Sequence, residues 1–320
     1  MEEKNFDLSQ IYIVDFIKNL GHKKNIFAII YLLLNVAIIA LFFNAVEENF
    51  WLALLYAILF YIATATVVLS PVGEWAFRLF NGCKKIKDPA LLNRLEPLFM
   101  EVKERAQTKH DDFIVDDRIN LYICEDESIN AFAMGRRTIC VTHGLLSLSD
   151  EEIKAVLGHE FGHLATHDTE LTLLITVGNF IITAIVTVIR VIAAVFNFFM
   201  FLGGLLTGED GALPRFLHLI ATLLATVCIN AVMWIWTQLG ILLVMKSSRE
   251  AEYEADAFSC DLGYSEGLLS FFRVLQSMEH RAGHGKKEKG NIFAALASSH
   301  PATEKRIARI EERATLAIEE

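Results

Sequence analysis

The string His159-Glu160-Phe161-Gly162-His163 is the part of the sequence best suited to chemistry. Residues four apart on an α-helix share a face, so the two histidines could hold one zinc ion between them. Glu160 stands beside them and could take a proton from a zinc-activated water, acting as a general base. The spacing therefore predicts a hydrolytic zinc site, provided that the string is helical and that a third ligand lies near it.

The residues that precede the string predict the helix. Ser149 and Glu152 fit a capping box, in which each side chain binds the backbone N–H of the other residue. Apolar side chains then recur at helical spacing at Ile153, Val156, Leu157, Phe161 and Leu164. We therefore expect an amphipathic helix over about residues 150–167.

A third ligand is expected in an acidic run near the C-terminal end of the chain. Catalytic zinc sites with two histidines commonly take a glutamate as well. Three glutamates compete for that place, namely Glu250, Glu252 and Glu254. Glu252 is favoured because Asp256 follows it on the same helix face, where it could accept a hydrogen bond from His159 and fix the orientation of that ring. The spacing alone leaves the other two glutamates open.

His167 is another candidate ligand, because it follows His163 by four residues. The metzincin pattern, however, requires a glycine and a histidine at the positions where this chain has Thr166 and Thr169. We therefore interpret His167 as a solvated residue near the C-terminus of the helix.

The composition predicts a membrane protein. The chain is 53% hydrophobic with a mean hydropathy of +0.39, which is too apolar for an ordinary soluble protein. Its net charge of −10 argues against nucleic acid as a partner. Its five cysteines form no C-x-x-C pair, which suits a reducing compartment and argues against a cysteine zinc site.

Two apolar runs, 26–45 and 50–69, are each long enough to span a bilayer, and 26–70 is expected to be a membrane hairpin. Residues 1–25 are expected to form an amphipathic segment on the membrane surface. Basic side chains flank the hairpin on both sides, at Lys18, Lys23, Lys24, Arg78, Lys84, Lys85 and Lys87. The positive-inside rule therefore predicts that both flanks lie in the cytosol.

A second membrane hairpin is expected over 171–245, where two longer apolar runs occur. The proposed ligands lie both before and after this hairpin in the sequence. Because ligands of one metal ion must lie on the same side of the membrane, the chain must cross the membrane an even number of times between them. We therefore expect one long helix out and one back. Arg190, inside the first of them, should pair, reach the membrane surface or line a polar cavity. The catalytic domain would consist of residues 71–170 and 246–320.

Short strand-like runs at 119–124, 128–134 and 138–142 predict a small antiparallel sheet. Its edge could bind an extended peptide substrate through backbone hydrogen bonds. The candidate residues for this are Asn130, Ala131, Phe132 and Ala133. The alternative is an ordinary strand of a small core.

Four motifs together resemble the HtpX-type integral-membrane zinc metalloproteases, which are related to the type I CAAX prenyl proteases. The motifs are H-E-F-G-H at 159–163, S-R-x-x-E-Y-x-A-D at 248–256, N-A-F-A at 130–133 and S-H-P-A-T-E-K-R-I at 299–307. The resemblance implies zinc ligands at His159, His163 and Glu252, with Glu160 as the catalytic glutamate. It also implies a cytosol-facing site in a bacterial-type inner membrane and a role in protein quality control. His300 matches a family position and is a candidate to stabilise the oxyanion; the alternative is a structural histidine before a proline.

The expected protein is therefore mostly α-helical and integral to the membrane, with four transmembrane helices in two hairpins and a cytosolic zincin-type α+β domain. It would be a metalloendopeptidase of the gluzincin type with one Zn²⁺ per chain, acting on polypeptides and especially on membrane proteins. The alternatives are a CAAX-type processing protease, a di-iron carboxylate protein and a scaffold without activity. The di-iron alternative is disfavoured because the chain has no second E-x-x-H string.

Overall fold

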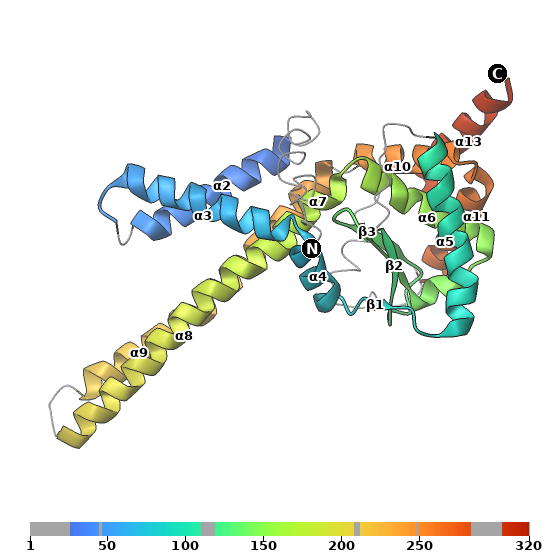
Figure 1. Cartoon of the computed structure of the whole chain (residues 1–320). Coiled ribbons are helices and arrows are strands. Elements are labelled where there is room, and N and C mark those ends of the chain that lie inside the picture. Colours follow the sequence, from blue (N-terminus) through green and yellow to red (C-terminus); the bar gives the residue numbers. More distant parts are fainter. Residues whose placement is uncertain are drawn as a thin grey trace, which may run out of the picture.

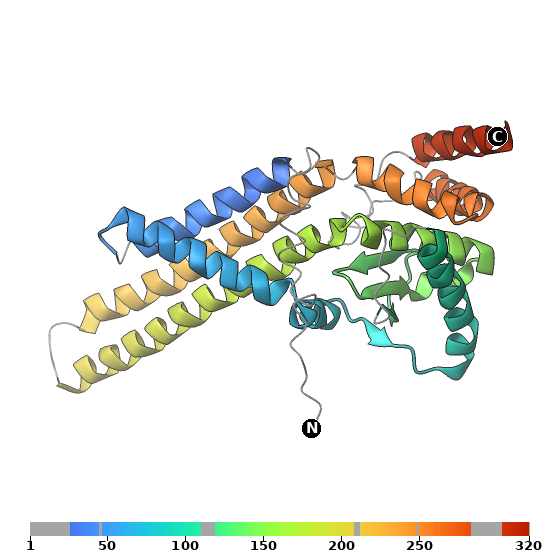
Figure 2. The same cartoon turned by 45° about the horizontal axis from the view of Figure 1, so that its top comes forward.

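The computed structural model describes residues 26–44, 47–109, 119–207, 212–247, 249–282 and 303–319. Long helices project to one side, and a small sheet covered by shorter helices lies at the other (Figures 1 and 2). The expected amphipathic segment 1–25 and His300 lie outside the described residues.

The first apolar pair consists of α2 (Ile26–Asn44) and α3 (Phe50–Val68), which lie side by side. Asn49 caps α3 by accepting hydrogen bonds from the backbone N–H groups of Trp51 and Leu52. Of the helices described, three are long and apolar enough to cross a membrane, at Phe50–Val68, Thr169–Gly203 and Leu213–Gly240, and Ile29–Asn44 is a shorter apolar helix. The structure therefore agrees with membrane-crossing helices on each side of the zinc motif.

The second apolar pair consists of α8 (Asn179–Thr207) and α9 (Ala212–Ser247), which pack along each other as two long helices, as expected. A short helix α7 (Asp168–Leu173) and a π-helical turn connect α8 to the zinc-motif helix. Arg190 lies half-buried within α8. Large apolar side chains of this pair point outward, including Phe196 and Leu224, as a lipid environment would require.

A polar network joins the two apolar pairs. The Asn179 amide of α8 donates hydrogen bonds to the Tyr31 hydroxyl of α2 at 2.6 Å and to the Thr237 hydroxyl of α9 at 3.3 Å. The Trp236 indole of α9 donates to the Asn35 amide oxygen of α2 at 2.6 Å, and its ring stacks on Tyr31. Because polar groups inside a membrane must find partners within the protein, this network fixes how α2, α8 and α9 pack.

The sheet differs from the antiparallel sheet expected. Its order is β1 (Lys84–Lys85), β2 (Asn120–Cys124), β4 (Thr138–Thr142) and β3 (Ala131–Met134). β2 and β4 are parallel, whereas β1 with β2 and β3 with β4 are antiparallel, so the sheet is mixed and the antiparallel prediction is wrong.

The parallel pair arises because β3, the strand that follows β2 in the sequence, does not lie next to β2 in the sheet. It lies one position further out, and β4 occupies the place between them. The connecting loop is held in place by Thr142, whose hydroxyl donates to the Ser128 carbonyl at 2.6 Å, and by the Gly144 N–H, which donates to the Asp126 carbonyl at 3.0 Å. β3 therefore forms the outer edge, and the turn at Gly135, where φ is +59°, leads β4 into the gap beside β2. Every residue of β4 is buried, as expected for a central strand.

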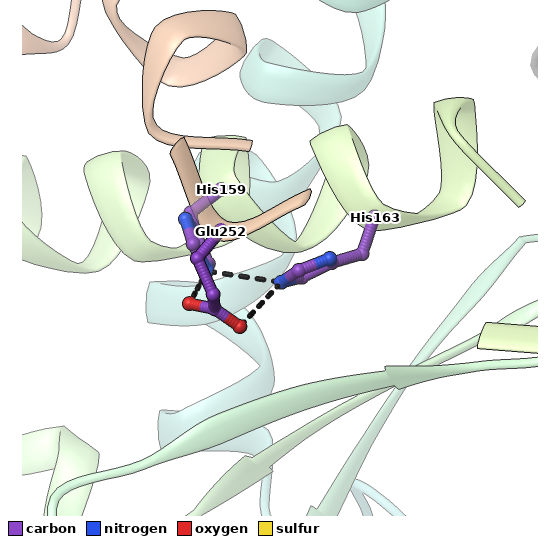
Figure 3. A group of neighbouring side chains, drawn as sticks. All are labelled: His159, His163 and Glu252. Atoms are coloured by element: carbon purple, nitrogen blue, oxygen red, sulfur yellow. Dashed lines mark hydrogen bonds and ion pairs between the residues drawn. The ribbon is translucent and has the colours of Figure 1, made fainter. Parts of the chain in front are cut away.

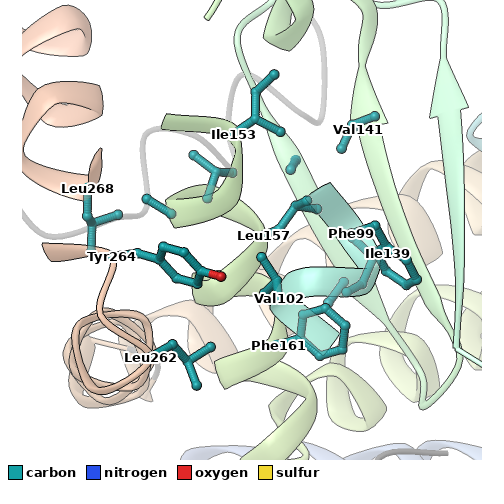
Figure 4. Close-up of a cluster of buried hydrophobic side chains, with 14 of the residues drawn as sticks. Phe99, Val102, Ile139, Val141, Ile153, Leu157, Phe161, Leu262, Tyr264 and Leu268 are labelled. Atoms are coloured by element: carbon teal, nitrogen blue, oxygen red, sulfur yellow. The ribbon is translucent and has the colours of Figure 1, made fainter. Parts of the chain in front are cut away.

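The zinc-motif helix is α6 (Asp150–Ala165), and the predicted capping box of Ser149 and Glu152 is present. The helix is buried on nearly all sides, although the sequence predicted an amphipathic one. It packs against the sheet and α5 (Pro89–Lys109) on one side and against α10 (Arg249–Asp261) and α11 (Ser265–Ala282) on the other. Figure 4 shows its apolar residues within this core. Because α6 is enclosed by the core, its side chains are held rigidly.

Candidate metal centre

Two helices that are far apart in the sequence bring the predicted ligands together (Figure 3). α6 carries His159 and His163, and α10 carries Glu252. The two Nε2 atoms lie 3.1 Å apart, and the Glu252 carboxylate lies 3.6 Å from the first and 3.5 Å from the second. All three ligand atoms lie within 4.8 Å of one another, and they form the one such group among the described residues.

The spacing of these three groups suits a zinc ion. Zinc binds histidine nitrogen and carboxylate oxygen at about 2.0–2.2 Å in a tetrahedral arrangement, which separates its ligand atoms by about 3.3 Å. The observed separations of 3.1, 3.5 and 3.6 Å lie around that value. Three protein ligands would leave a fourth position for water or substrate, as in catalytic zinc sites.

Two glycines within the motif helix allow α10 to approach so closely. A Cβ atom on Gly162 would lie 2.8 Å from the Ala255 Cα, and one on Gly158 would lie 2.8 Å from the Ser259 hydroxyl. The Ser259 hydroxyl in turn donates to the Ala155 carbonyl of α6 at 2.8 Å. Small residues on both helices thus set the distance between the histidines and Glu252, which the sequence analysis did not foresee.

Gly162→Ala is therefore expected to disturb the site even though no ligand changes. The added methyl group would meet the backbone of α10 and push that helix outward, at a cost of about 1–3 kcal/mol for overpacking. We expect a lower melting temperature and weaker zinc binding, measured by thermal unfolding and by competition with a chelator. Gly203→Ala in α8 is the matched control, because a Cβ there meets nothing within 4 Å. Equal behaviour of the two variants would contradict this account of the helix contact.

Asp256 lies where the sequence analysis expected it. Its carboxylate is 2.9 Å from Nδ1 of His159, so that ring can present Nε2 to a metal. Burial raises the pKa of the Asp256 carboxyl, but the charge and hydrogen bonds of Arg306, together with the contact of His159, outweigh burial and hold that pKa below its ordinary value. Asp256 therefore carries a negative charge beside the histidine.

Arg306 is a residue of this site that the sequence analysis missed. It comes from α13 (Thr303–Glu319) and binds both oxygens of Asp256, at 2.6 and 2.7 Å. It also lies 3.1 Å from Glu252 and 4.3 Å above the Phe272 ring. Its signal in the sequence is its place in the motif at 299–307. Arg306 links the C-terminal helix to the ligand and to the residue that orients His159.

Arg306→Met is expected to destabilise the protein and weaken zinc binding. Removing one partner of a buried ion pair leaves an uncompensated charge and costs about 3–5 kcal/mol. Loss of the partners that orient metal ligands lowers affinity by about 10–100-fold. Arg306→Lys should retain part of the stability and part of the zinc affinity, since lysine keeps the positive charge but cannot bind both oxygens of Asp256 at once.

Thermal unfolding and chelator competition measure these effects. The matched control is Arg309→Met on the same helix, where Arg309 is exposed and lies over the Tyr253 ring. A normal zinc affinity and melting temperature for Arg306→Met would show that the contact is incidental.

Glu160 lies beside the ligands and faces the edge of the sheet. It is buried, with 6% of its surface exposed, and one of its oxygens accepts a hydrogen bond from the backbone N–H of Ala133 in β3 at 2.7 Å. This contact holds the carboxylate between the ligand group and the edge strand, where a substrate carbonyl would have to lie.

The remaining candidates lie away from the ligand group. Glu250 and Glu254 are exposed on α10. His167, which has a positive φ of 57°, is part-exposed at the end of α6 and contacts Glu170 at 3.2 Å. Neither these glutamates nor His167 belongs to the group of potential metal ligands among the described residues.

Comparison with known proteins agrees with the motifs. The model of a family described as Peptidase family M48 matches residues 93–314, which include α6, α10 and Arg306. The chain belongs to peptidase family M48. The M48 family is a metalloprotease family, so a metal is expected at the His159, His163 and Glu252 group.

Curated relatives of this M48 chain carry the name expected from the motifs. A "Protease HtpX homolog" from Lactobacillus helveticus is 30% identical over 207 residues, which cover 60% of this chain and 66% of that protein. A homologue from Streptococcus gordonii is 27% identical over 285 residues, covering 82% and 84%, and "Protease HtpX" of Idiomarina loihiensis is 28% identical over 254 residues, covering 76% and 80%. The predicted resemblance to the HtpX-type proteases is thus confirmed. The crystal structure of S. mikatae Ste24p aligns with 94% of this chain and 67% of its own, at 18% identity and a TM-score of 0.40.

Proposed function

We propose that this chain is an integral-membrane zinc endopeptidase that cleaves misfolded or membrane proteins. The observation that carries the proposal is the convergence of His159, His163 and Glu252 next to Glu160, all within reach of an edge strand. This set of residues suits hydrolysis. It combines three metal ligands with a fourth group, the Glu160 carboxylate, which is not a ligand and can take a proton from water.

The roles of the residues follow from their positions. Zinc held by the two histidines and Glu252 would lower the pKa of a water molecule and polarise the peptide carbonyl. Glu160 takes the proton from the attacking water and passes it to the leaving amine. Asp256 and Arg306 orient His159, and the N–H of Ala133 fixes the carboxylate of Glu160.

The substrate is proposed to add as a further strand beside β3. Ala133 directs its N–H away from β4, because that group donates to Glu160. Asn130 instead directs its carbonyl toward β4, where it accepts from the Thr142 N–H at 3.0 Å. Backbone direction alternates along a strand, so Ala131 also faces the open edge, and the backbone of Phe132 faces β4. Among Asn130, Ala131 and Phe132, we therefore assign the backbone contacts with substrate to Ala131.

The proposed placement in the cell rests on the charge pattern. Two membrane hairpins, 26–70 and 171–245, would hold the catalytic parts 71–170 and 246–320 on one side. The basic residues that flank the first hairpin favour the cytosolic side of a bacterial-type inner membrane. Polypeptides with unfolded segments near the membrane would then reach β3 directly.

Purified full-length protein in detergent tests the proposal. Cleavage of casein that is abolished by a chelator and restored by zinc, with one zinc per chain by metal analysis, is the expected result. Cleavage confined to prenylated peptides would favour a CAAX-type processing protease instead. Two iron ions per chain without proteolysis would favour the di-iron alternative.

A further inference from the structure

Three of the five cysteines gather on one face of the sheet, away from the metal ligands. Cys124 ends β2, Cys140 lies in the middle of β4, and Cys83 directly precedes β1. They pack with Tyr122 and Phe132 in a small cluster on the face opposite the one that contacts α6. We call Cys83, Cys124 and Cys140 the thiol cluster. None of the three is part of a disulfide in this structure.

The strand register brings two of these thiols directly opposite each other. Lys84 pairs with Ile123 in the antiparallel ladder, so Cys83 stands opposite Cys124. The Cys83 N–H donates to the Arg78 carbonyl at 2.9 Å, so it does not bond across this ladder. Antiparallel pairs without such bonds have Cα atoms about 4.5 Å apart. That spacing lies within the range of about 4.4–6.8 Å that disulfides accept.

The surroundings make the pair reactive. Cys83 is half-buried, whereas Cys124 and Cys140 are buried, so a small reagent from solvent reaches Cys83 first. The thiol of Cys140 and the backbone N–H of Asp126 hydrogen-bond to Cys124 and lower its pKa despite its burial. A thiolate at Cys124 is the form that attacks oxidised sulfur.

We propose that Cys83 and Cys124 form a reversible disulfide when the protein meets hydrogen peroxide. Peroxide oxidises the Cys83 thiol to a sulfenic acid and is reduced to water. The Cys124 sulfur then attacks the Cys83 sulfur, forming the S–S bond and releasing a second water. A dithiol returns the pair to two thiols. This inference is independent of the proposed proteolysis, and it fits the transient, redox-sensing disulfides of reducing compartments.

The bond would add a covalent link between the segment that leads into β1 and the strand β2, where Arg78 of α4 (Pro71–Phe80) already lies over the Tyr122 ring at 4.9 Å. α4 follows the first apolar pair and leads to Cys83, and the loop closed by the disulfide contains α5, which packs on α6. Oxidation would therefore fix the position of this segment relative to β2.

Peptide mapping of the full-length protein tests the proposal. The reduced protein is treated with a few equivalents of hydrogen peroxide, alkylated with N-ethylmaleimide and digested with trypsin. The three thiols fall on separate peptides, 79–84, 119–136 and 138–154. We expect peptides 79–84 and 119–136 to be recovered as a disulfide-linked pair that a dithiol separates. We also expect Cys83 to lose its reactivity toward N-ethylmaleimide about tenfold faster than Cys260 does. Cys260 is the matched control, because it is also half-buried but lies on α10.

Variants make the outcome decisive. Cys124→Ser should leave Cys83 as a sulfenic acid that a cyclic 1,3-dione traps, and Cys140→Ala should leave the bridge in place. Two results would overturn the proposal: a bridge from Cys83 to Cys140, or oxidation of Cys83 and Cys124 at the rate of Cys260. Thermal unfolding of each reduced variant confirms that it is folded.

Discussion

Glu160→Gln is expected to lower the rate of peptide cleavage by about 10²–10⁴-fold, the usual contribution of a general base. The amide has nearly the same size as the carboxylate but cannot take a proton from the attacking water. Zinc content should stay at one per chain, because the substitution leaves all three ligands in place. Cleavage of a fluorogenic peptide and metal analysis of the same sample measure the two effects separately.

Glu151→Gln is the matched control for this experiment. It makes the same chemical change in the first turn of α6, where Glu151 is exposed and pairs with Lys154. This variant should cleave the peptide at the normal rate. Near-normal turnover of Glu160→Gln would remove Glu160 from the proposed mechanism, and loss of zinc from it would show that the residue acts on the metal instead.

Glu252→Ala is expected to weaken zinc binding by more than about 100-fold, since even the loss of residues that merely orient ligands costs about 10–100-fold. The carboxylate is the one ligand that α10 contributes to the group, so two histidines would remain. Titration of the metal-free protein with zinc in competition with a chelator measures the effect, and cleavage should fall with zinc occupancy.

The two neighbouring glutamates serve as controls for that variant. Glu250→Ala and Glu254→Ala change exposed carboxylates on the same helix and should bind zinc normally. Zinc loss in either of them, with Glu252→Ala unaffected, would move the third ligand and contradict the assignment. Circular dichroism of all three variants shows whether α10 remains folded.

Local signals in the sequence predicted the local parts of the site. Ser149 and Glu152 cap α6 because their partners are backbone groups three residues away, which spacing alone can identify. The positions of Glu252 and Asp256 on one helix face follow from helical periodicity in the same way. Such interactions involve residues that are close together in the sequence, so they can be predicted without knowing the rest of the fold.

The features that the sequence did not predict depend on contacts between distant segments. β4 enters the sheet beside β2, and no property of either strand shows which neighbour it will have. Gly162 occupies a position that the H-E-x-x-H pattern leaves open to any residue, and the need for glycine there comes from the close approach of α10. Arg306 binds Asp256 from a helix that is fifty residues away in the chain. The sequence spacing of the cysteines likewise could not show that Cys83 and Cys124 are neighbours, because they become neighbours only when β1 pairs with β2.

Anomalous diffraction at the zinc absorption edge, from crystals of zinc-loaded full-length protein, tests the central claim most directly. We predict one anomalous peak per chain, about 2.0–2.2 Å from Nε2 of His159, Nε2 of His163 and a carboxylate oxygen of Glu252. A zinc peak elsewhere, or one that Glu252 does not contact, would contradict the account.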